Sequence, residues 1–265
     1  ALVLCFVFLG LSMIQSRASF IAIGLILLSY IILNIILYFK VNKKPSQLFE
    51  IGYFIVPLIV AILINQTTLS NKGADAISRA ATISISTNDG SVNQRLRYYE
   101  DVLTHLLSNP ILGVGLGNWK LKSIDYDSKD IVGYVVPYHA HSDFIQLGAE
   151  LGIVGFLLYL GIFIWALYYG YILIRYSKLS ITEKVFIFLL LTALGVYSID
   201  ANLNFPIARP QVLVVWVIIM GFITVYFQNH RTQSVKIKSN NRINTFFLIV
   251  SILIPLPSIY VSQMV

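Results

Sequence analysis

The chain has 265 residues, of which 57% are hydrophobic and only 12% are charged, and its formal net charge is +7. Soluble domains average about 25% charged residues, so this composition excludes an ordinary soluble domain and indicates a polytopic membrane protein. The positive charge forms no basic stripe interleaved with aromatic residues, which excludes nucleic-acid binding. The single cysteine, Cys5, lies in an apolar run and cannot form an internal disulfide.

Several apolar stretches are candidates for membrane-spanning helices, because a helix needs about 20 mostly apolar residues to cross the hydrocarbon core. They are 1–16, 18–39, 51–65, 144–174, 185–199, 210–227 and 244–262. Two of them, 51–65 and 185–199, are short and are expected to recruit flanking residues. Pro255 and Pro257 are expected to kink the last stretch or leave it at the interface. The predicted fold class is all-α, a polytopic transmembrane helix bundle of about seven spans with a long, partly helical extracytoplasmic loop.

The sequence divides accordingly into transmembrane helices in 1–65, an extracytoplasmic loop in 66–143 and transmembrane helices in 144–265. The chain begins inside an apolar run, with neither an initiator Met nor a basic leader before it. We therefore expect further spans to precede residue 1.

Charge sorts the loops onto two sides of the membrane. Ten Lys and Arg residues, against two acidic residues, lie in the short loops 40–50, 175–184 and 228–243. Short loops rich in Lys and Arg stay in the cytoplasm. Arg17, the long loop and the segment from Asp200 to Arg209 are therefore expected outside.

The long loop contains an amphipathic helix over residues 93–108, ended by Asn109 and Pro110. Its apolar positions recur at three- and four-residue spacing and are Leu96, Tyr99, Val102, Leu103, Leu106 and Leu107. Its polar side is expected to carry Arg95, Glu100, Asp101 and His105. Such a helix can lie on the outer face of the membrane.

A glycine series follows this helix at Gly113, Gly115 and Gly117. It lacks the Gly-Lys-Ser/Thr of a P-loop and the spacing of a dinucleotide fingerprint. The series therefore indicates a tight turn that lets the loop pack against the spans.

Two histidines, His139 and His141, stand where the loop runs into the apolar stretch 144–174. Asp143 and Gln146 have the spacing of a capping box, although Ser142 is an alternative cap. Gly148 and Gly152 are expected to let neighbouring helices approach closely. The start of this helix is expected to point outward beside His141, and its partial positive charge favours anions and a neutral imidazole that can act as a base.

These histidines have alternative interpretations, and so do the other two in the chain. Each can be a loop residue bonded to backbone, and the His-x-His pair could bind zinc, but no third ligand with suitable spacing lies nearby. His105 on the loop helix and His230 in a basic loop are expected to be passive.

Four arginines on the outer side are candidates for binding phosphate oxygens through their bidentate guanidinium groups: Arg17, Arg95, Arg97 and Arg209. The alternative for Arg17 is an interfacial residue that reaches the lipid headgroups. Arg95 and Arg97 lie at the start of the predicted helix, where positive charges are unfavourable because they oppose the helix dipole. The alternative is that both belong to a solvated face of the helix. Arg209 lies between two prolines, which favours a structural turn.

Three pieces of the chain, taken in order, resemble the O-antigen ligase and polymerase superfamily of bacterial inner-membrane glycosyltransferases. They are Ser16-Arg17, the run Arg95-Leu-Arg-Tyr-Tyr99 leading into Asn109–Trp119, and His141-Ser-Asp-Phe-Ile-Gln-Leu-Gly-Ala-Glu-Leu-Gly-Ile-Val-Gly155. The family usually has His-Asn at the third piece, where this chain has His141-Ser142.

The resemblance implies a GT-C-like, multi-pass protein of the bacterial inner (cytoplasmic) membrane with its active site on the periplasmic face. Its donor would be a glycan on undecaprenyl diphosphate, and its acceptor a hydroxyl of lipid A core, of another glycan or of a protein. Membrane lipids are its other implied partners. Neither a cofactor nor a metal is implied. Arg17 and Arg95 match arginines that hold the diphosphate, and His141 matches the histidine that activates the acceptor hydroxyl, with His139 as the second candidate.

Ligase and polymerase activity are not separated by these residues, because both would use the same donor. A transporter or flippase of lipid-linked glycans would need ionisable residues at mid-membrane depth, and the predicted spans contain almost none. A membrane anchor with a sensory loop would tolerate changes at Arg95 and His141.

Overall fold

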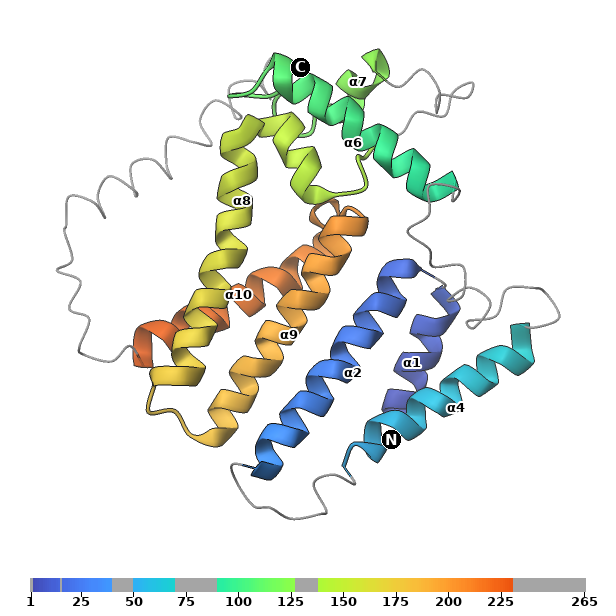
Figure 1. Ribbon diagram of the computed structural model, residues 1–265, viewed down its shortest axis with the longest axis vertical. Helices are drawn as coiled ribbons and strands as arrows, with labels where there is room; N and C mark the ends of the chain where they lie inside the picture. Colours follow the sequence, from blue (N-terminus) through green and yellow to red (C-terminus); the bar gives the residue numbers. More distant parts are fainter. Residues whose placement is uncertain (1, 15, 40–49, 70–89, 127–137, 231–265) are drawn as a thin grey trace.

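The computed structural model describes residues 2–14, 16–39, 50–69, 90–126 and 138–230. In this part of the chain every regular element is a helix (Figure 1), which confirms the all-α prediction. The α-helices are α1 (Leu2–Ile14), α2 (Arg17–Leu37), α4 (Gly52–Leu69), α6 (Gly90–Ser108), α7 (Trp119–Lys122), α8 (Asp143–Tyr176), α9 (Ile181–Leu203) and α10 (Pro210–His230). The 3₁₀-helices are η3 (Ser123–Asp125) and η4 (Pro206–Ala208).

The apolar helices have the lengths of a membrane bundle. Among the described residues, the four helices α2, α8, α9 and α10 are long and apolar enough to cross a membrane. The helices α1 and α4 are apolar but shorter. Each of the first six stretches predicted from the sequence is thus helical, and the polytopic class fits. The seventh, 244–262, lies outside the described residues.

The bundle has two groups of helices joined through α2. In the first group α1 packs against α4, where Phe8 meets Phe54 edge to face with ring centroids 4.9 Å apart. In the second group α8, α9 and α10 pack around one apolar core. The two groups meet where Leu25 of α2 lies against Gly195 of α9, at which an added Cβ would come within 3.0 Å of the leucine side chain.

The two predicted sides of the membrane correspond to opposite ends of this bundle. The turn between α8 and α9 lies at the end remote from α6 (Figure 1), and it contains Lys178 and is flanked by Arg175 and Lys184. There α9 begins in a capping box, in which the Ser180 hydroxyl accepts from the Glu183 amide and the Glu183 carboxylate accepts from the Ser180 amide. With this cap α9 includes residues on both sides of the predicted 185–199, as expected for an apolar stretch that is too short to cross the membrane alone.

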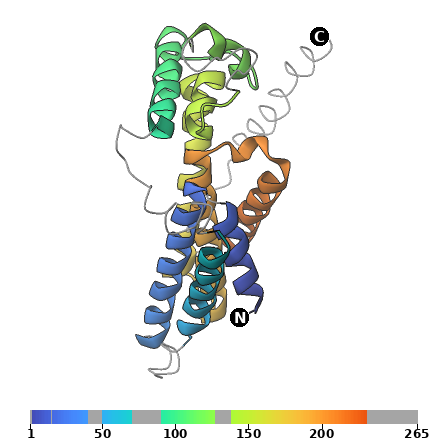
Figure 2. The same cartoon turned by 90° about the vertical axis from the view of Figure 1, so that its right-hand side faces the viewer.

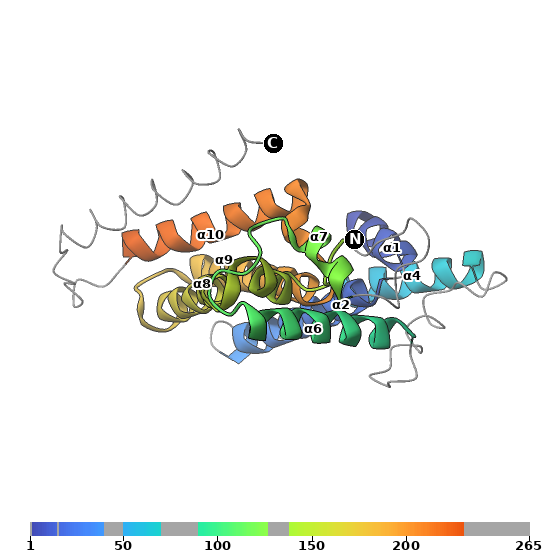
Figure 3. The same ribbon diagram turned by 90° about the horizontal axis from the view of Figure 1, so that it is seen from above.

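A loop layer, residues 90–126, covers the other end of the bundle (Figures 2 and 3). Its main helix, α6, packs against α8 and begins three residues before the predicted start. The buried face of α6 carries Tyr98 and Val102, whereas Leu103 and Leu107 are exposed. The helix is thus amphipathic as predicted, and its apolar positions divide between the face that packs against α8 and an exposed face.

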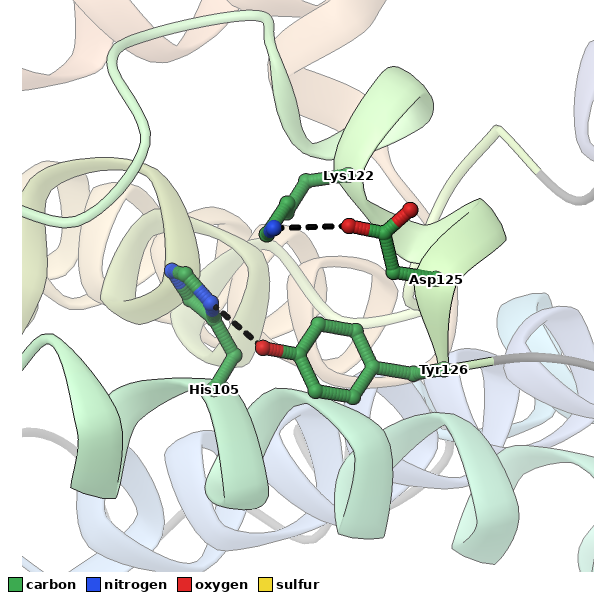
Figure 4. Close-up of polar contacts among 4 residues, drawn as sticks. All are labelled: His105, Lys122, Asp125 and Tyr126. Atoms are coloured by element: carbon green, nitrogen blue, oxygen red, sulfur yellow. Dashed lines mark hydrogen bonds and ion pairs between the residues drawn. The ribbon is translucent and has the colours of Figure 1, made fainter.

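His105 was expected on the polar side of α6, but it is buried. Its Nδ1 lies 3.1 Å from the Tyr126 hydroxyl, and its ring contacts the buried Trp119 (Figure 4). Beside this pair Lys122 donates to Asp125 at 2.7 Å (Figure 4). The short segment of α7 and η3 folds back over α6 and covers the face that carries His105. This makes His105 part of the packing of the loop layer.

The helix α8 is broken at Gly152, whose φ of 69° and ψ of −170° are not helical. Phe144 lies eight residues before the break and Tyr159 seven residues after it, yet their ring centroids are 4.9 Å apart. The N-terminal arm (143–151) therefore folds back along the C-terminal arm (153–176). The C-terminal arm alone is about 36 Å long at 1.5 Å per residue, which is enough to cross the hydrocarbon core.

The glycine series packs against this break, as the sequence predicted. Gly113, Gly115 and Gly117 all have positive φ. A Cβ on Gly113 would overlap the Ala149 carbonyl, and one on Gly152 would overlap the Ile111 carbonyl. Gly152 is thus needed for a bend and for close contact with the Ile111 backbone, whereas the sequence predicted that it lets a neighbouring helix approach closely.

Candidate functional site

The two histidines lie immediately before the N-terminal arm of α8. Ser142 is the N-cap, and its hydroxyl accepts from the Ile145 amide at 3.5 Å. The alternative capping box of Asp143 and Gln146 is not formed. The Gln146 carbonyl oxygen instead accepts from the Ala140 amide at 3.2 Å, which holds the histidine segment against the helix.

The start of α8 points back toward the bundle, because the break at Gly152 reverses the direction of the chain (Figure 1). Asp143, which is fully buried, accepts from the Ile207 amide in η4 at 3.0 Å. The expectation that this helix start points away from the membrane bundle is therefore wrong. The reversal brings the histidines next to the segment that joins α9 to α10.

Phe205, in that segment, is the centre of the cluster. The His139 ring stacks on it with centroids 4.1 Å apart, and the His141 ring meets its edge at 5.5 Å. The Arg209 guanidinium carbon lies 4.7 Å from the centre of the same ring. The turn expected from the flanking prolines is present, with Pro206 opening η4 and Pro210 opening α10. Phe205 was not predicted from the sequence, where its only signal is an aromatic residue beside a proline turn.

The helix α6 supplies the other wall of the site. The Tyr99 hydroxyl lies 3.4 Å from the carbonyl oxygen of His141 and 3.3 Å from that of Asn202, at the end of α9. The Tyr98 ring is stacked near the His141 ring, with centroids 6.0 Å apart. Both tyrosines lie in the run Arg95–Tyr99 that carries the resemblance, but a role for them at the site was not predicted, because it depends on which face of α6 is buried.

His141 is half-buried among positive charges. Burial lowers the pKa of His141 below its ordinary value, and the charges of Arg95, His139 and Arg209 lower it further. Arg95 and Arg209 thus act on one imidazole although they are 114 residues apart in the chain. The neutral form of this ring is favoured at neutral pH.

The backbone of His141 is strained. Its φ of 55° makes it the non-glycine residue with a positive φ in the described part of the chain. Its Nδ1 is buried, and among the described residues no group bonds to it. Strained backbone and unsatisfied buried polar atoms concentrate at functional sites.

Arg17 lies at the same end of the bundle as this cluster. Leu25 is eight residues after Arg17, and Gly195, which Leu25 contacts, is eight residues before the end of α9 at Leu203. At 1.5 Å per residue both offsets are about 12 Å, and α2 and α9 run in opposite directions, so Arg17 is level with Leu203.

Arg97 is two residues from Arg95, and two residues turn an α-helix by about 200°, so the two side chains leave α6 in different directions. His105 contributes to the loop layer, and His230 ends α10 at the opposite end of the bundle. In the described residues no three His, Cys, Asp or Glu side chains are grouped as a metal site requires.

Comparison with known proteins gives one match. The model of the O-antigen ligase family matches residues 1–160, which is more than half of the 265-residue chain. No curated protein and no solved structure matches.

Proposed function

The chain belongs to the O-antigen ligase family, and from this premise we propose that it transfers a glycan from a polyprenyl-diphosphate carrier to an acceptor hydroxyl outside the cytoplasm. The observation that carries this proposal is the convergence of Arg95, Arg209 and the two histidines at one end of the bundle. Cations suit a diphosphate, and a neutral imidazole suits the removal of a hydroxyl proton.

The chemistry follows from these groups. The acceptor oxygen attacks the anomeric carbon, the bond from that carbon to the diphosphate oxygen breaks, and its electron pair leaves with the diphosphate. Negative charge grows on the leaving group, where Arg95, Arg209 and Arg17 would stabilise it. A histidine of the pair takes the acceptor proton. The diphosphate is itself a good leaving group, so the reaction requires no nucleotide.

The depth of the site fits a lipid-linked donor. The break in α8 returns the histidines to the level of Tyr159, about 10 Å back along the C-terminal arm from Gly152. We propose that the diphosphate of a membrane-anchored donor lies at this level of the bundle.

The experiment compares Arg95→Ala with Arg97→Ala, two arginines of one helix on different sides. Each variant is expressed in a strain that lacks the gene, and glycan transfer and accumulation of the lipid-linked intermediate are measured. We expect Arg95→Ala to abolish transfer with normal membrane insertion, and Arg97→Ala to retain it. Wild-type glycan with Arg95→Ala, or with the double variant His139→Ala/His141→Ala, would overturn the proposal.

The same strain separates the two activities that share the donor. A ligase attaches the accumulated glycan to a different acceptor, whereas a polymerase extends the glycan on its own carrier. The chain-length distribution and the acceptor of the product therefore identify the activity.

A further inference from the structure

One stripe of α6 faces the histidine segment. Arg95, Tyr98, Tyr99 and Val102 are spaced three and four residues apart, so they lie within about 100° of one another around the helix. Tyr98 and Val102 are buried, and Val102 belongs to one apolar core with Ala149 of α8. The packing that buries this stripe also brings the charge of Arg95 to the site.

The hydroxyl of Tyr99 connects three parts of the fold. It lies 3.4 Å from the carbonyl oxygen of His141, which is 42 residues away in the chain, and 3.3 Å from that of Asn202, which is 103 residues away. Burial raises the pKa of Tyr99, so the hydroxyl keeps its proton and can donate it to these carbonyl groups. The hydroxyl thus ties α6 to the histidine segment and to the end of α9.

The backbone of His141 has a conformation that must be held by its surroundings. Its φ of 55° is in the left-handed region, which the Cβ of an L-residue disfavours. On one side of it the Ala140 amide donates to Gln146, and on the other Ser142 caps α8. The carbonyl group of His141 itself is held from α6, by the Tyr99 hydroxyl.

Two aromatic rings enclose the imidazole of His141. The Tyr98 ring is parallel to it within 10°, with centroids 6.0 Å apart, and the edge of Phe205 meets it at 5.5 Å. The direction in which a side chain leaves the backbone follows from φ and ψ, so a change at φ would move the imidazole out of this position.

We infer that Tyr99 is a positioning residue, whose hydroxyl holds the backbone of His141 in the left-handed conformation and thereby keeps the imidazole between Tyr98 and Phe205. Because α6 also carries Arg95, one helix sets the distance between a cation and an imidazole of the site. The consequence for catalysis rests on the proposed function, with His141 as the member of the pair that takes the acceptor proton, as the resemblance implies.

Tyr99→Phe tests the inference, because it keeps the ring and removes only the hydroxyl. We expect kcat to fall about 2- to 10-fold, the change in rate that corresponds to one hydrogen bond, with little change in the KM for the donor.

The pH profile should also change. Burial lowers the pKa of His141, and the charges of Arg95, His139 and Arg209 lower it further. An imidazole released from this position should titrate closer to its ordinary value of about 6.5, so the acid limb of the profile should move to higher pH in Tyr99→Phe.

The titration of His141 can be measured without a donor. The full-length protein is labelled with ¹⁵N-histidine and placed in vesicles of phosphatidylethanolamine and phosphatidylglycerol, and nitrogen NMR follows each imidazole with pH. His105 is the internal reference, because it is buried in the same loop layer, six residues further along α6. The two signals are identified by their loss in His105→Gln and His141→Gln.

Tyr126→Phe is the matched control. It removes a hydroxyl of the same layer that lies 3.1 Å from the Nδ1 of His105. This variant should change the titration of His105 and leave that of His141 as in the wild type, whereas Tyr99→Phe should do the reverse.

Two results would contradict the inference. One is an unchanged titration of His141 in Tyr99→Phe. The other is an equal shift of His105 and His141 in that variant, because the hydroxyl would then stabilise the loop layer as a whole. Absence of transfer by the wild type would instead contradict the proposed function, and the NMR titration would still decide the role of Tyr99.

Discussion

Phe144 and Tyr159 are 15 residues apart in one helix, yet their rings are in contact, with centroids 4.9 Å apart. A straight helix would separate them by about 22 Å. The contact exists because Gly152 reverses the chain, and the reversal brings the histidine segment to the end of α9. The position of the candidate site therefore depends on one glycine.

Gly152→Ala should disrupt this reversal. Alanine at a φ of 69° and a ψ of −170°, a conformation essentially confined to glycine, costs about 1–3 kcal/mol, and its Cβ would also overlap the Ile111 carbonyl. We expect a lower unfolding midpoint for the purified protein and loss of transfer. Gly161→Ala is the control in the same helix, because a Cβ there meets nothing within 4 Å. Equal midpoints for the two variants would contradict the role of Gly152.

Phe205→Leu should reduce transfer with little loss of membrane insertion. The change removes the ring on which His139 stacks and over which the Arg209 guanidinium lies, so both groups lose their orientation. An oriented aromatic contact contributes about 0.5–1.5 kcal/mol, so we expect a decrease of several-fold to tenfold in initial rate. Phe6→Leu, at an exposed position of α1, should leave the rate unchanged.

Asp143→Ala and Asp143→Asn should differ in stability. Alanine leaves the Ile207 amide without its acceptor, which costs about 1–3 kcal/mol for a buried group, whereas asparagine keeps an acceptor oxygen. Because η4 precedes Arg209, we also expect the alanine variant to transfer more slowly. Thermal unfolding of both purified variants checks the order, and a less stable asparagine variant would contradict it.

The loop layer should loosen in mild acid. Burial and the charge of Lys122 lower the pKa of His105, so the folded state binds a proton less readily than the unfolded state. The stabilising packing of neutral His105 against Tyr126 and Trp119 is therefore present above the ordinary histidine pKa of about 6.5 and is lost as the pH falls through the lowered value.

Limited proteolysis of residues 90–126 across this pH range measures the effect. His105→Gln should remove most of the pH dependence, and His230→Gln, at the other end of the bundle, should keep it. A pH dependence that survives in His105→Gln would assign it to another group.

Several features were predicted from local sequence because local forces produce them. Apolar stretches of membrane length became helices, and the basic turn between α8 and α9 lies at the end remote from the histidines. The glycine series formed the predicted tight turn, since positive φ is available to glycine at little cost. The amphipathic helix was also predicted, but the burial of His105 was not, because burial depends on α7 covering that face.

The sequence by itself determined the class of the protein, since composition and hydrophobic length decide whether a chain belongs in a bilayer, and it identified the histidines and arginines as chemical groups. Tertiary structure alone decided which of these groups meet. The reversal at Gly152 brought His139 onto Phe205, and the packing of α6 brought the charge of Arg95 to His141. Both join residues distant in sequence, which no local pattern encodes.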